Sequence, residues 1–546
     1  MIKLGISSLY HDAAACIVDD NIVKAAIEEE RFTGVKHDSS FPRNSIKWLL
    51  HTTNLKITDI QEVHWYENPN KKDDRVKTIF KKKPFKTFFL QRKYNKNKKI
   101  NSPEILLKSI GYTGKIVYHD HHQSHAAFSY FTSPFKESAI LTVDGVGEWE
   151  TTTISKAKGN TITKLISINY PNSLGMLYST ITSYLGFKPN EGEYKVMGLA
   201  PYGNPEIYLD KLRTIFTNTS NKYLINQKYF TWEYSDKIMF NKHLYKLLDL
   251  LPRLPEEDIT QEHKDLAAAL QTVYEEQFIL LLKTVKNITK SDNICLGGGC
   301  AYNGVANSLA YNYFKKLHIP FSPSDSGSAI GACLNSHIKL SPYLGPSYNN
   351  HQIRKILKKY KSKVYAFKLS DDKLIKKTAK LIVNQNIVAW FQGKMEFGAR
   401  ALGNRSILAS PTNPQMREKL NYVIKKREGF RPFAPSVLED KAINFFDIKE
   451  PVPFMNQVVK SKVNSIPAAT HIDGTCRVQT VKRTHNPKYY DLISEVGRLT
   501  NIPVVLNTSF NLKDQTITNS PQQAIERFIS SKIDFLIIGN FLVNKI

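Results

Sequence analysis

Apolar residues near the N-terminus alternate with short polar turns in a way that predicts strands. Residues 2–8 (IKLGISS) predict one strand, and residues 10–32 predict a second strand, an Asp-Asp-Asn turn and a third strand. The same order returns at 138–168, where a strand, an acidic turn and two β-rich runs around Gly159 follow one another. Two copies of strand, acidic turn and hairpin indicate duplicated halves, each built on a sheet.

Helical periodicity marks the segments between and after these strands. We expect a helix opened by Pro42, another starting near His121, and a mostly helical stretch over 205–290 whose clearest amphipathic part is 260–288. A polar stretch with Pro, Gly and Ser then covers 341–363, after which strands and helices restart. We therefore place the domain boundary near 345–360 and divide the chain into domains 1–350 and 351–546.

The basic charge of the chain is concentrated in one segment. The 76 Lys and Arg against 49 Asp and Glu give +27, and residues 71–100 contribute 13 basic and two acidic side chains, or +11. Such an insertion is either a solvated surface or a contact for a polyanion, meaning nucleic acid, anionic lipid or an acidic glycan. Phe85, Phe88, Phe89 and Tyr94 interleave with the charge, which suits an anionic membrane surface or stacked bases.

Composition narrows the class of protein further. The apolar fraction is 41%, and with the 26 glycines it reaches about 46%, which is typical of globular domains. It excludes global disorder, collagen-like repeats and a disulfide-stapled mini-protein. The five cysteines are widely spaced without a CxxC pair, which favours a reducing cytoplasm over a cysteine-based zinc site. No run of 18 apolar residues predicts a transmembrane helix, and His11-Asp12 interrupts the apolar N-terminus too early for a signal peptide.

A histidine-rich segment offers ligands for a metal ion. His121 and His125 are four residues apart, so a helix would place both imidazoles on one face. Asp144 and Asp325, each beside small residues, are candidate oxygen ligands. Two histidines and two carboxylates without a thiolate suit Fe(II), Mn(II) or Zn(II). A chance spacing among the 15 histidines is the alternative interpretation.

A glycine-rich turn is a candidate phosphate site. Residues 297–303 (GGGCAYN) join an apolar strand to a helix, where backbone N–H groups can approach a phosphate. No GK[ST] follows, so the segment is not a Walker A loop, and an ordinary tight turn is the alternative.

Cations gather in three loops of the C-terminal part. Arginines in loops rich in Gly and Pro are suited to bidentate binding of oxyanions, so we favour a polyphosphate pocket over solvated charge. After the strand at 502–505, Asn507, Ser509 and Asn511 add neutral polar groups. The cationic residues are Lys394, Arg400, Arg405, Lys425, Lys426, Arg427, Arg431, His471 and Arg477.

Together these motifs resemble the O-carbamoyltransferases of the NodU/CmcH family, in order and over nearly the whole length. The basic segment 71–100 has no counterpart in that family, Ala399 stands where many relatives have Pro, and Asp514-Gln515 replaces an expected Gly turn. His119 and His122 are expected at the surface or behind the metal ligands. The motifs are YHDAAA (10–15), EERF (29–32), KHD (36–38), HHQSHAA (121–127), TVDGVGE (142–148), NSLGMLYS (172–179), GEYKVMGLAPYG (192–203), GGGCAYN (297–303), DSGSAIGA (325–332), EFGARALGNRSILA (396–409), REGFRPFAPSV (427–437), HIDGTCRVQ (471–479) and NTSFN (507–511).

The resemblance implies a fold and a reaction. It implies an α/β protein with a duplicated ASKHA-type (actin-like ATPase) N-terminal domain and a smaller YrdC-like C-terminal domain. In the family, carbamoyl phosphate and ATP, taken here as its magnesium complex, give carbamoyladenylate and pyrophosphate at the YrdC-like site. The carbamoyl group then passes in the ASKHA-type domain to a hydroxyl of an acceptor, expected to be a sugar, and AMP leaves.

The resemblance also assigns roles to residues. It implies an iron-type metal that holds the adenylate phosphate, with His121, His125, Asp144 and Asp325 as ligands. It places Gly298, Gly299 and Asn303 near the nucleotide, while Asn507 and Asn511 orient nucleotide or carbamoyl groups. Positive charge for the two anionic substrates would come from Arg400, Lys425, Arg431 and Arg477. His11 would act as general base on the acceptor hydroxyl, or else cap a turn.

Other functions stay open at this stage. A threonylcarbamoyl-type tRNA-modifying transferase would use the net charge for RNA, and an ASKHA-fold kinase would use Asp144-Gly145 near phosphate. A non-catalytic anion-binding protein would need none of the ordered motifs. The acceptor is not named by the sequence: an antibiotic or toxin sugar, a Nod-factor-like glycan and a lipopolysaccharide sugar all fit. The oligomeric state is also open.

Overall fold

The chain divides into two compact units in the computed structural model, which describes residues 1–235 and 237–546. Unit 1 comprises Met1–Glu29 and His37–Leu340, and unit 2 comprises Glu30–Lys36 and Ser341–Ile546. The predicted division at 350 did not include the short segment with α1 (Glu30–Thr33) in the second unit. Within unit 2 the guanidinium of Arg31 donates to the carbonyl of Gly398 over 2.8 Å, a contact that no local pattern predicts.

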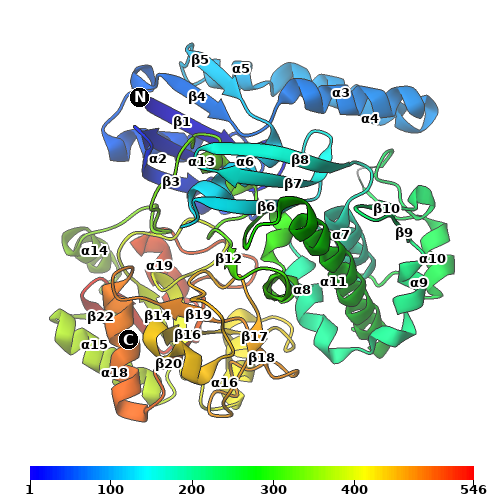
Figure 1. Cartoon of the computed structure of the whole chain (residues 1–546). Helices are drawn as coiled ribbons and strands as arrows, with labels where there is room; N and C mark the ends of the chain where they lie inside the picture. Colours follow the sequence, from blue (N-terminus) through cyan, green and yellow to red (C-terminus); the bar gives the residue numbers. More distant parts are fainter. Residues whose placement is uncertain (236) are drawn as a thin grey trace. The chain divides into compact units, whose positions relative to one another are not determined.

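Unit 1 contains two five-stranded sheets of identical topology (Figure 1). The first has the order β3-β2-β1-β4-β5 and the second β8-β7-β6-β11-β12. In both, the opening strand pairs antiparallel with the next strand and parallel with the fourth. The predicted duplication is therefore present. The strands are β1 (Ile2–Ser7), β2 (Ala14–Asp19), β3 (Ile22–Glu28), β4 (Glu62–Trp65) and β5 (Lys115–Tyr118), then β6 (Glu137–Val143), β7 (Glu150–Lys158), β8 (Thr161–Asn169), β11 (Asn293–Gly297) and β12 (Lys316–His318).

Two buried helices carry polar residues into the interior of unit 1. Helix α6 (His121–Phe131) contacts α13 (Asp325–Gly331), and each also contacts one of the sheets. The two helices approach closely because α13 contains glycine. A Cβ at Gly327 would lie 2.7 Å from Cδ1 of Phe128, and one at Gly331 would lie 2.0 Å from the carbonyl oxygen of Ser124, both on α6. This packing brings the N-termini of both helices into one region.

The other helices of unit 1 surround this core. The expected mostly helical stretch over 205–290 is wrong in part, since β9 (Phe216–Asn218) and β10 (Tyr223–Ile225) form a hairpin there. The aromatic side chains of Tyr223, Tyr229 and Trp232 are buried, so tertiary packing outweighs local helical propensity. The helices are α2 (Arg43–Thr53), α3 (Pro69–Lys82), α4 (Pro84–Ile100), α5 (Pro103–Lys108), α7 (Leu174–Tyr184), α8 (Glu193–Leu199), α9 (Leu209–Arg213), α10 (Lys242–Leu248), α11 (Gln261–Thr289) and α12 (Gly304–Ser308).

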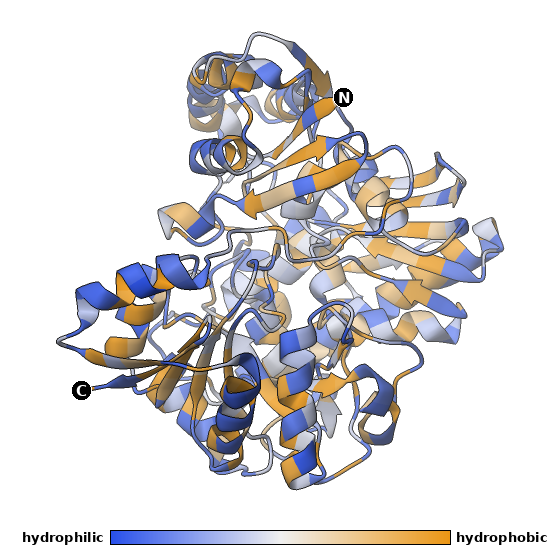
Figure 2. Cartoon of the chain, turned by 90° about the vertical axis from the view of Figure 1, so that its left-hand side faces the viewer, coloured by the Kyte–Doolittle hydropathy of each residue, from blue (hydrophilic) through white to orange (hydrophobic). Residues whose placement is uncertain are grey.

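Unit 2 is built on a mixed eight-stranded sheet covered on both faces. Val388 and Trp390 of one strand join a core with α15 (Asp371–Val383) and α18 (Pro487–Thr500), while Ala389 and Phe391 face α14 (Asn350–Leu357) and α19 (Pro521–Ile529). Figure 2 shows these strands as mainly hydrophobic. The order is β13 (Val364–Lys368), β22 (Phe541–Lys545), β21 (Phe535–Ile538), β14 (Val388–Phe391), β15 (Arg405–Ala409), β20 (Val504–Ser509), β16 (Ala434–Leu438) and β19 (Gln479–Val481).

The helices of the two units reach 29 residues in α11, but the long ones are mixed in polarity. In the ranges 1–235 and 237–546, none of them has the combination of length and apolar character that a membrane crossing requires.

Candidate functional site

The predicted ligand residues of unit 1 converge at one buried point. His121 and His125 come from the first turns of α6, Asp144 follows β6, and Asp325 opens α13. One ligand atom from each lies within 4.8 Å of the others. The two imidazole Nε2 atoms are 3.0 Å apart. Oδ2 of Asp144 lies 3.1 and 2.9 Å from them, and Oδ1 of Asp325 lies 3.6 and 3.3 Å from them.

The chemistry of this cluster fits a cation. Both oxygens of Asp325 are buried and accept no hydrogen bond, although the side chain is only 1% exposed. A buried carboxylate in that state is costly unless a positive charge neutralises it. Burial lowers the pKa of His125, but the neighbouring carboxylates of Asp144, 2.9 Å away, and Asp325, 3.3 Å away, outweigh burial and raise this pKa to about 9. A divalent metal with two nitrogen and two oxygen ligands would neutralise the same carboxylates.

Neighbouring groups hold the imidazole of His125 and the backbone at the start of α6 in place. Ser328 Oγ lies 2.9 Å from Nδ1 of His125, so one ring nitrogen is engaged and Nε2 points at the cluster. The buried carboxylate of Glu148 accepts from the backbone N–H of His121 (3.0 Å) and of Asn68 (2.7 Å). Sequence reasoning did not assign roles to Ser328 and Glu148. The only signal was their position inside the motifs that carry the two aspartates.

His11 lies at the edge of this cluster. Its Nε2 is 3.7 Å from Oδ2 of Asp325, and its Nδ1 is 3.0 Å from Oδ2 of Asp12. The other oxygen of Asp12 is 2.7 Å from Nδ1 of His37. Burial lowers the pKa of His11, but the charge of Asp325 and the hydrogen bond with Asp12 raise it to about 10. Asp12 was missed in the sequence, where its signal was only that it follows His11.

The glycine-rich turn lies against the strand that leads to Asp144. Gly298 has φ 85°, and a Cβ there would be 2.2 Å from the carbonyl oxygen of Val143. A Cβ at Gly299 would be 3.1 Å from Oδ1 of Asp144. Asn303 caps α12 through Ala306 N–H and exchanges amide hydrogen bonds with Gln271. The turn is thus next to the cluster, whereas the Asn303 side chain is engaged within the protein.

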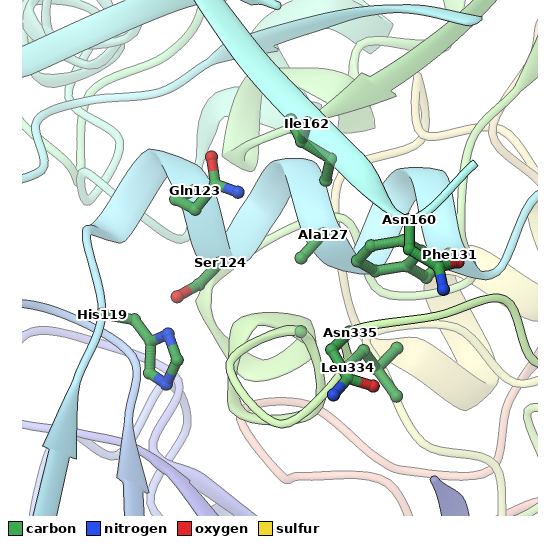
Figure 3. A pocket seen from close by; sticks show the side chains of 10 residues that line it. His119, Gln123, Ser124, Ala127, Phe131, Asn160, Ile162, Leu334 and Asn335 are labelled. Atoms are coloured by element: carbon green, nitrogen blue, oxygen red, sulfur yellow. The ribbon is translucent and has the colours of Figure 1, made fainter. Parts of the chain in front are cut away.

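The two remaining histidines of the segment lie outside the cluster. His122 is buried, with Nδ1 2.7 Å from Thr142 Oγ1 and Nε2 3.0 Å from the Glu150 carbonyl. His119 stacks on His64, and burial together with that neighbour lowers its pKa to about 4. His119 also lines a pocket of ≈ 180 Å³ on another face of α6 (Figure 3). The labelled side chains around that pocket do not include the four cluster residues.

Two of the predicted anion-binding cations of unit 2 form hydrogen bonds within the protein. Arg405 is fully buried, stacks 3.7 Å from the Phe391 ring centre, and donates to four backbone carbonyls, those of Gln392, Asn404, Pro346 and Gly393. Its inclusion among the anion-binding cations is therefore wrong, because both terminal nitrogens donate within the protein and the remaining Nε–H is buried.

The ammonium of Lys425 is committed in the same way. It donates to the Ser509 carbonyl (2.6 Å), the Asn511 carbonyl (2.9 Å) and Asn511 Oδ1 (2.7 Å). An ammonium has three donors, so none is left for a substrate in this arrangement. Burial, aided by Arg427 and Arg431, lowers the pKa of Lys425 well below its ordinary value. The structure gives Lys425 a place in shaping the Asn511 loop.

The neutral and imidazole side chains of unit 2 differ in whether they keep a polar atom that could bind a ligand. Asn511 also donates to the Gln515 carbonyl (2.7 Å), so its amide is engaged. Asn507 donates through Nδ2 to Gln479 Oε1 at 2.9 Å, while its buried Oδ1 accepts no hydrogen bond. Nε2 of His471 is likewise buried without a partner, and burial above all lowers the pKa of His471 to about 4. Both atoms can accept a hydrogen bond from a ligand.

The three predicted arginines lie in separate loops. Arg400 follows Glu396, whose carboxylate accepts the backbone N–H groups of Leu402 and Asn404 and so holds that loop. Arg431 lies 3.4 Å from Glu428, and its charge helps to lower the pKa of Lys425. The charge of Arg477 helps to lower the pKa of His471. All three guanidinium groups are partly exposed. That they share one oxyanion pocket stays a prediction.

Comparisons with known proteins identify the family. A family model described as Carbamoyltransferase N-terminus matches residues 2–334, and one described as Carbamoyltransferase C-terminus matches residues 379–545. An uncharacterized protein of Synechocystis is 37% identical over 99% of this chain and 96% of its own length. Nodulation protein NolNO of Sinorhizobium fredii is 33% identical over 99% and 80%. Nodulation protein NolO of Bradyrhizobium diazoefficiens is 35% identical over 78% and 79%.

Solved structures are more distant. The activator of 2-hydroxyisocaproyl-CoA dehydratase from Clostridium difficile with bound ADPNP covers 61% of this chain and 92% of its own at 12% identity, with a TM-score of 0.32. The ROK hexokinase from Thermus thermophilus covers 62% and 98% at 12% identity, with a TM-score of 0.27. Likeness at this level carries no argument about the site. The two family models and the relatives matched along nearly the whole chain show that this protein belongs to the carbamoyltransferase family and is a transferase.

Proposed function

We propose that this O-carbamoyltransferase works in two steps, one in each unit. Unit 1, with its duplicated sheets, would be the ASKHA-type domain, and unit 2 the YrdC-like domain. In unit 2, water releases the phosphoryl group of carbamoyl phosphate as inorganic phosphate. An oxygen of the resulting carbamate attacks the α-phosphorus of ATP, and pyrophosphate leaves. The product is carbamoyladenylate, a mixed anhydride with a better leaving group than a free carbamate.

The second step transfers the carbamoyl group in unit 1. The oxygen of an acceptor hydroxyl attacks the carbamoyl carbon, the bond from that carbon to the phosphate oxygen breaks, and AMP leaves. His11 would take the hydroxyl proton on Nε2, while Asp12 orients the ring through Nδ1. The observation that carries this proposal is the position of His11, 3.7 Å from Asp325 at the edge of the metal cluster.

His121, His125, Asp144 and Asp325 would hold Fe(II), or Mn(II) or Zn(II). When bound, such a metal binds phosphate oxygens and stabilises the charge that develops on the leaving group. Its charge would also offset the pull of Asp325 on the proton of His11. Gly298 and Gly299 would lie against the nucleotide, since the left-handed φ of Gly298 turns the backbone beside Asp144 and Gly299 has no side chain there.

Unit 2 would supply the charge for adenylate formation. Arg400, Arg431 and Arg477 would bind the phosphates of the two substrates, with ATP as its magnesium complex. The open acceptors Asn507 Oδ1 and His471 Nε2 suit a carbamoyl N–H or a ribose hydroxyl. Lys425 and Asn511, which bond to each other, would shape the pocket without direct contact.

A test supplies ATP, magnesium and carbamoyl phosphate together with a panel of sugars and glycans. Mass spectrometry should find an acceptor with a carbamoyl mass increment, and AMP and pyrophosphate in equal amounts. Transfer to tRNA would favour the threonylcarbamoyl-type alternative. Phosphorylated acceptor and ADP without need for carbamoyl phosphate would instead indicate a kinase. Either result would overturn the proposal.

A further inference from the structure

The basic segment of unit 1 folds into two packed helices, α3 and α4, which lie side by side in Figure 1. Phe80 of α3 meets the ring of Tyr94 edge-on at 6.0 Å, and Asp73 binds both Lys77 (2.7 Å) and Lys98 (2.9 Å). The pair is also anchored to the rest of unit 1, because Arg75 donates to the Gly147 carbonyl over 2.9 Å. The segment is therefore a structured part of the unit.

One face of α4 exposes a row of aromatic rings. Phe85, Phe88 and Phe89 are 97, 52 and 81% exposed, and their spacing of three and four residues places them together on the helix. Thr87, on the opposite side, is the one residue of α4 that is buried. The rings add nothing to the core, and exposing them to water is unfavourable.

Cations continue the same face. Arg92, Lys96 and Lys99 follow the phenylalanines at helical spacing and are exposed. From 75 to 103 the chain has 11 Lys and Arg and no acidic residue. The face formed by these three cations and the three phenylalanines is called the aromatic-basic face below.

We propose that the aromatic-basic face of α4 docks the protein on a lipid bilayer that carries anionic headgroups. The helix would lie in the plane of the interface, with the phenylalanine rings at the boundary of the acyl chains and the cations among the headgroups. Like charge opposes the alternative that a second copy of the chain covers this face. Proteins that bind single-stranded nucleic acid use a groove with a platform on which the bases stack. Exposed rings on the convex surface of a helix instead favour insertion into a lipid layer.

The test is flotation of the full chain, without substrates, on vesicles. Phosphatidylcholine with 30 mol% phosphatidylglycerol, a composition of about the anionic content this mode requires, should carry the protein, and phosphatidylcholine alone should carry at least ~10-fold less. Binding should fall as NaCl is raised, because charge screening weakens the headgroup contacts.

The decisive variant replaces Phe85, Phe88 and Phe89 by Ser. Its bound fraction should fall at least ~10-fold while the melting temperature is unchanged, since the rings are exposed. The matched control is Y365S/F367S, which removes two exposed rings (57 and 53%) beside exposed Lys363 and Lys368 of unit 2 and should bind normally.

Three outcomes would overturn the docking proposal. They are equal binding to both vesicles, loss of binding in Y365S/F367S with retention in the triple Ser variant, and tight binding of the chain to a poly(dT) oligonucleotide with none to vesicles. No carbamoyl transfer is measured, so failure of the docking proposal and failure of the proposed function are distinguishable.

Discussion

The His–Asp cluster of unit 1 and the cationic loops of unit 2 are both candidate binding sites in the sequence, but their polar groups are used differently. In unit 1, ring nitrogens and carboxylates point at one another, and the Asp325 oxygens accept no hydrogen bond. In unit 2, the terminal nitrogens of Arg405 and the ammonium of Lys425 donate hydrogen bonds to carbonyl groups of the protein itself. A cluster of ligands with unmet bonding capacity is thus a stronger sign of a site than a count of charges.

The difference has a simple physical origin. An arginine or lysine has several donors, and an interior with many carbonyl groups readily satisfies them. Carboxylates and imidazole lone pairs are acceptors that need a hydrogen-bond donor or a cation. A buried pocket lined by such acceptors contains no donors that could satisfy them. Four predictions test this contrast.

The largest effect should come from Arg477→Ala. If this guanidinium binds a substrate phosphate, pyrophosphate release that depends on carbamoyl phosphate should fall ~10²–10³-fold. The melting temperature should change little, because the side chain is partly exposed. Arg498→Ala, which removes an exposed arginine paired with Glu495 on α18, is the matched control. Normal release in the Arg477 variant would remove this residue from the site.

Asp325→Asn should abolish metal binding. Substitution of residues that only support the ligands typically lowers metal affinity ~10–100-fold. Loss of a ligand itself should therefore lower the metal content and acceptor carbamoylation at least ~100-fold. Adenylate formation should persist. Elemental analysis gives the metal content, and His119→Ala on the same segment serves as control.

The stability of the metal-free Asp325→Asn protein is a second, independent measurement on the same cluster. This protein should be less stable to unfolding than the metal-free parent by about 3 kcal/mol at neutral pH, because the buried imidazolium groups of His125 and His11, whose pKa values Asp325 raises, lose a negative partner. A variant with full metal content, or a metal-free variant more stable than the metal-free parent, would contradict the cluster.

Lys425→Met should act through stability. Its three hydrogen bonds tie the π-helical segment Lys419–Lys425 to the Asn511 loop. The free energy of unfolding, measured by urea denaturation, should therefore fall by about 3 kcal/mol. Lys426→Met, at the exposed neighbouring position, should be within ~0.5 kcal/mol of the parent. Loss of pyrophosphate release in the Lys425 variant at unchanged stability would restore it as a substrate ligand.

The smallest effect should come from Lys72→Ala. Lys72 binds Glu67 (2.8 Å), and its ammonium lies 5.9 Å from the centre of the Tyr10 ring, next to His11. If it borders the acceptor, the KM for acceptor should rise about three- to tenfold at constant adenylate formation. Lys77→Ala on the same helix should leave this KM unchanged, and equal shifts in both variants would exclude a local contact.

Much of unit 1 could be predicted because its signals are local. Strand alternation and turn residues defined both hairpins, including Asp20 and Asn21, whose φ values of 45° and 63° suit the tight turn. The spacing of His121 and His125 placed them on one helix face. The hairpin at 216–225 was missed because its aromatic residues are set by burial against distant partners.

By itself, the sequence determined the duplicated order of elements, the residue types of the His–Asp cluster and the family, because these follow from local periodicity and ordered motifs. Only the tertiary structure decided which charges are available. Lys425 meets carbonyls 84 and 86 residues away, and Ser328 meets His125 across 203 residues. Such pairings depend on how sheets and helices pack, and local propensity carries no information about a partner so far along the chain.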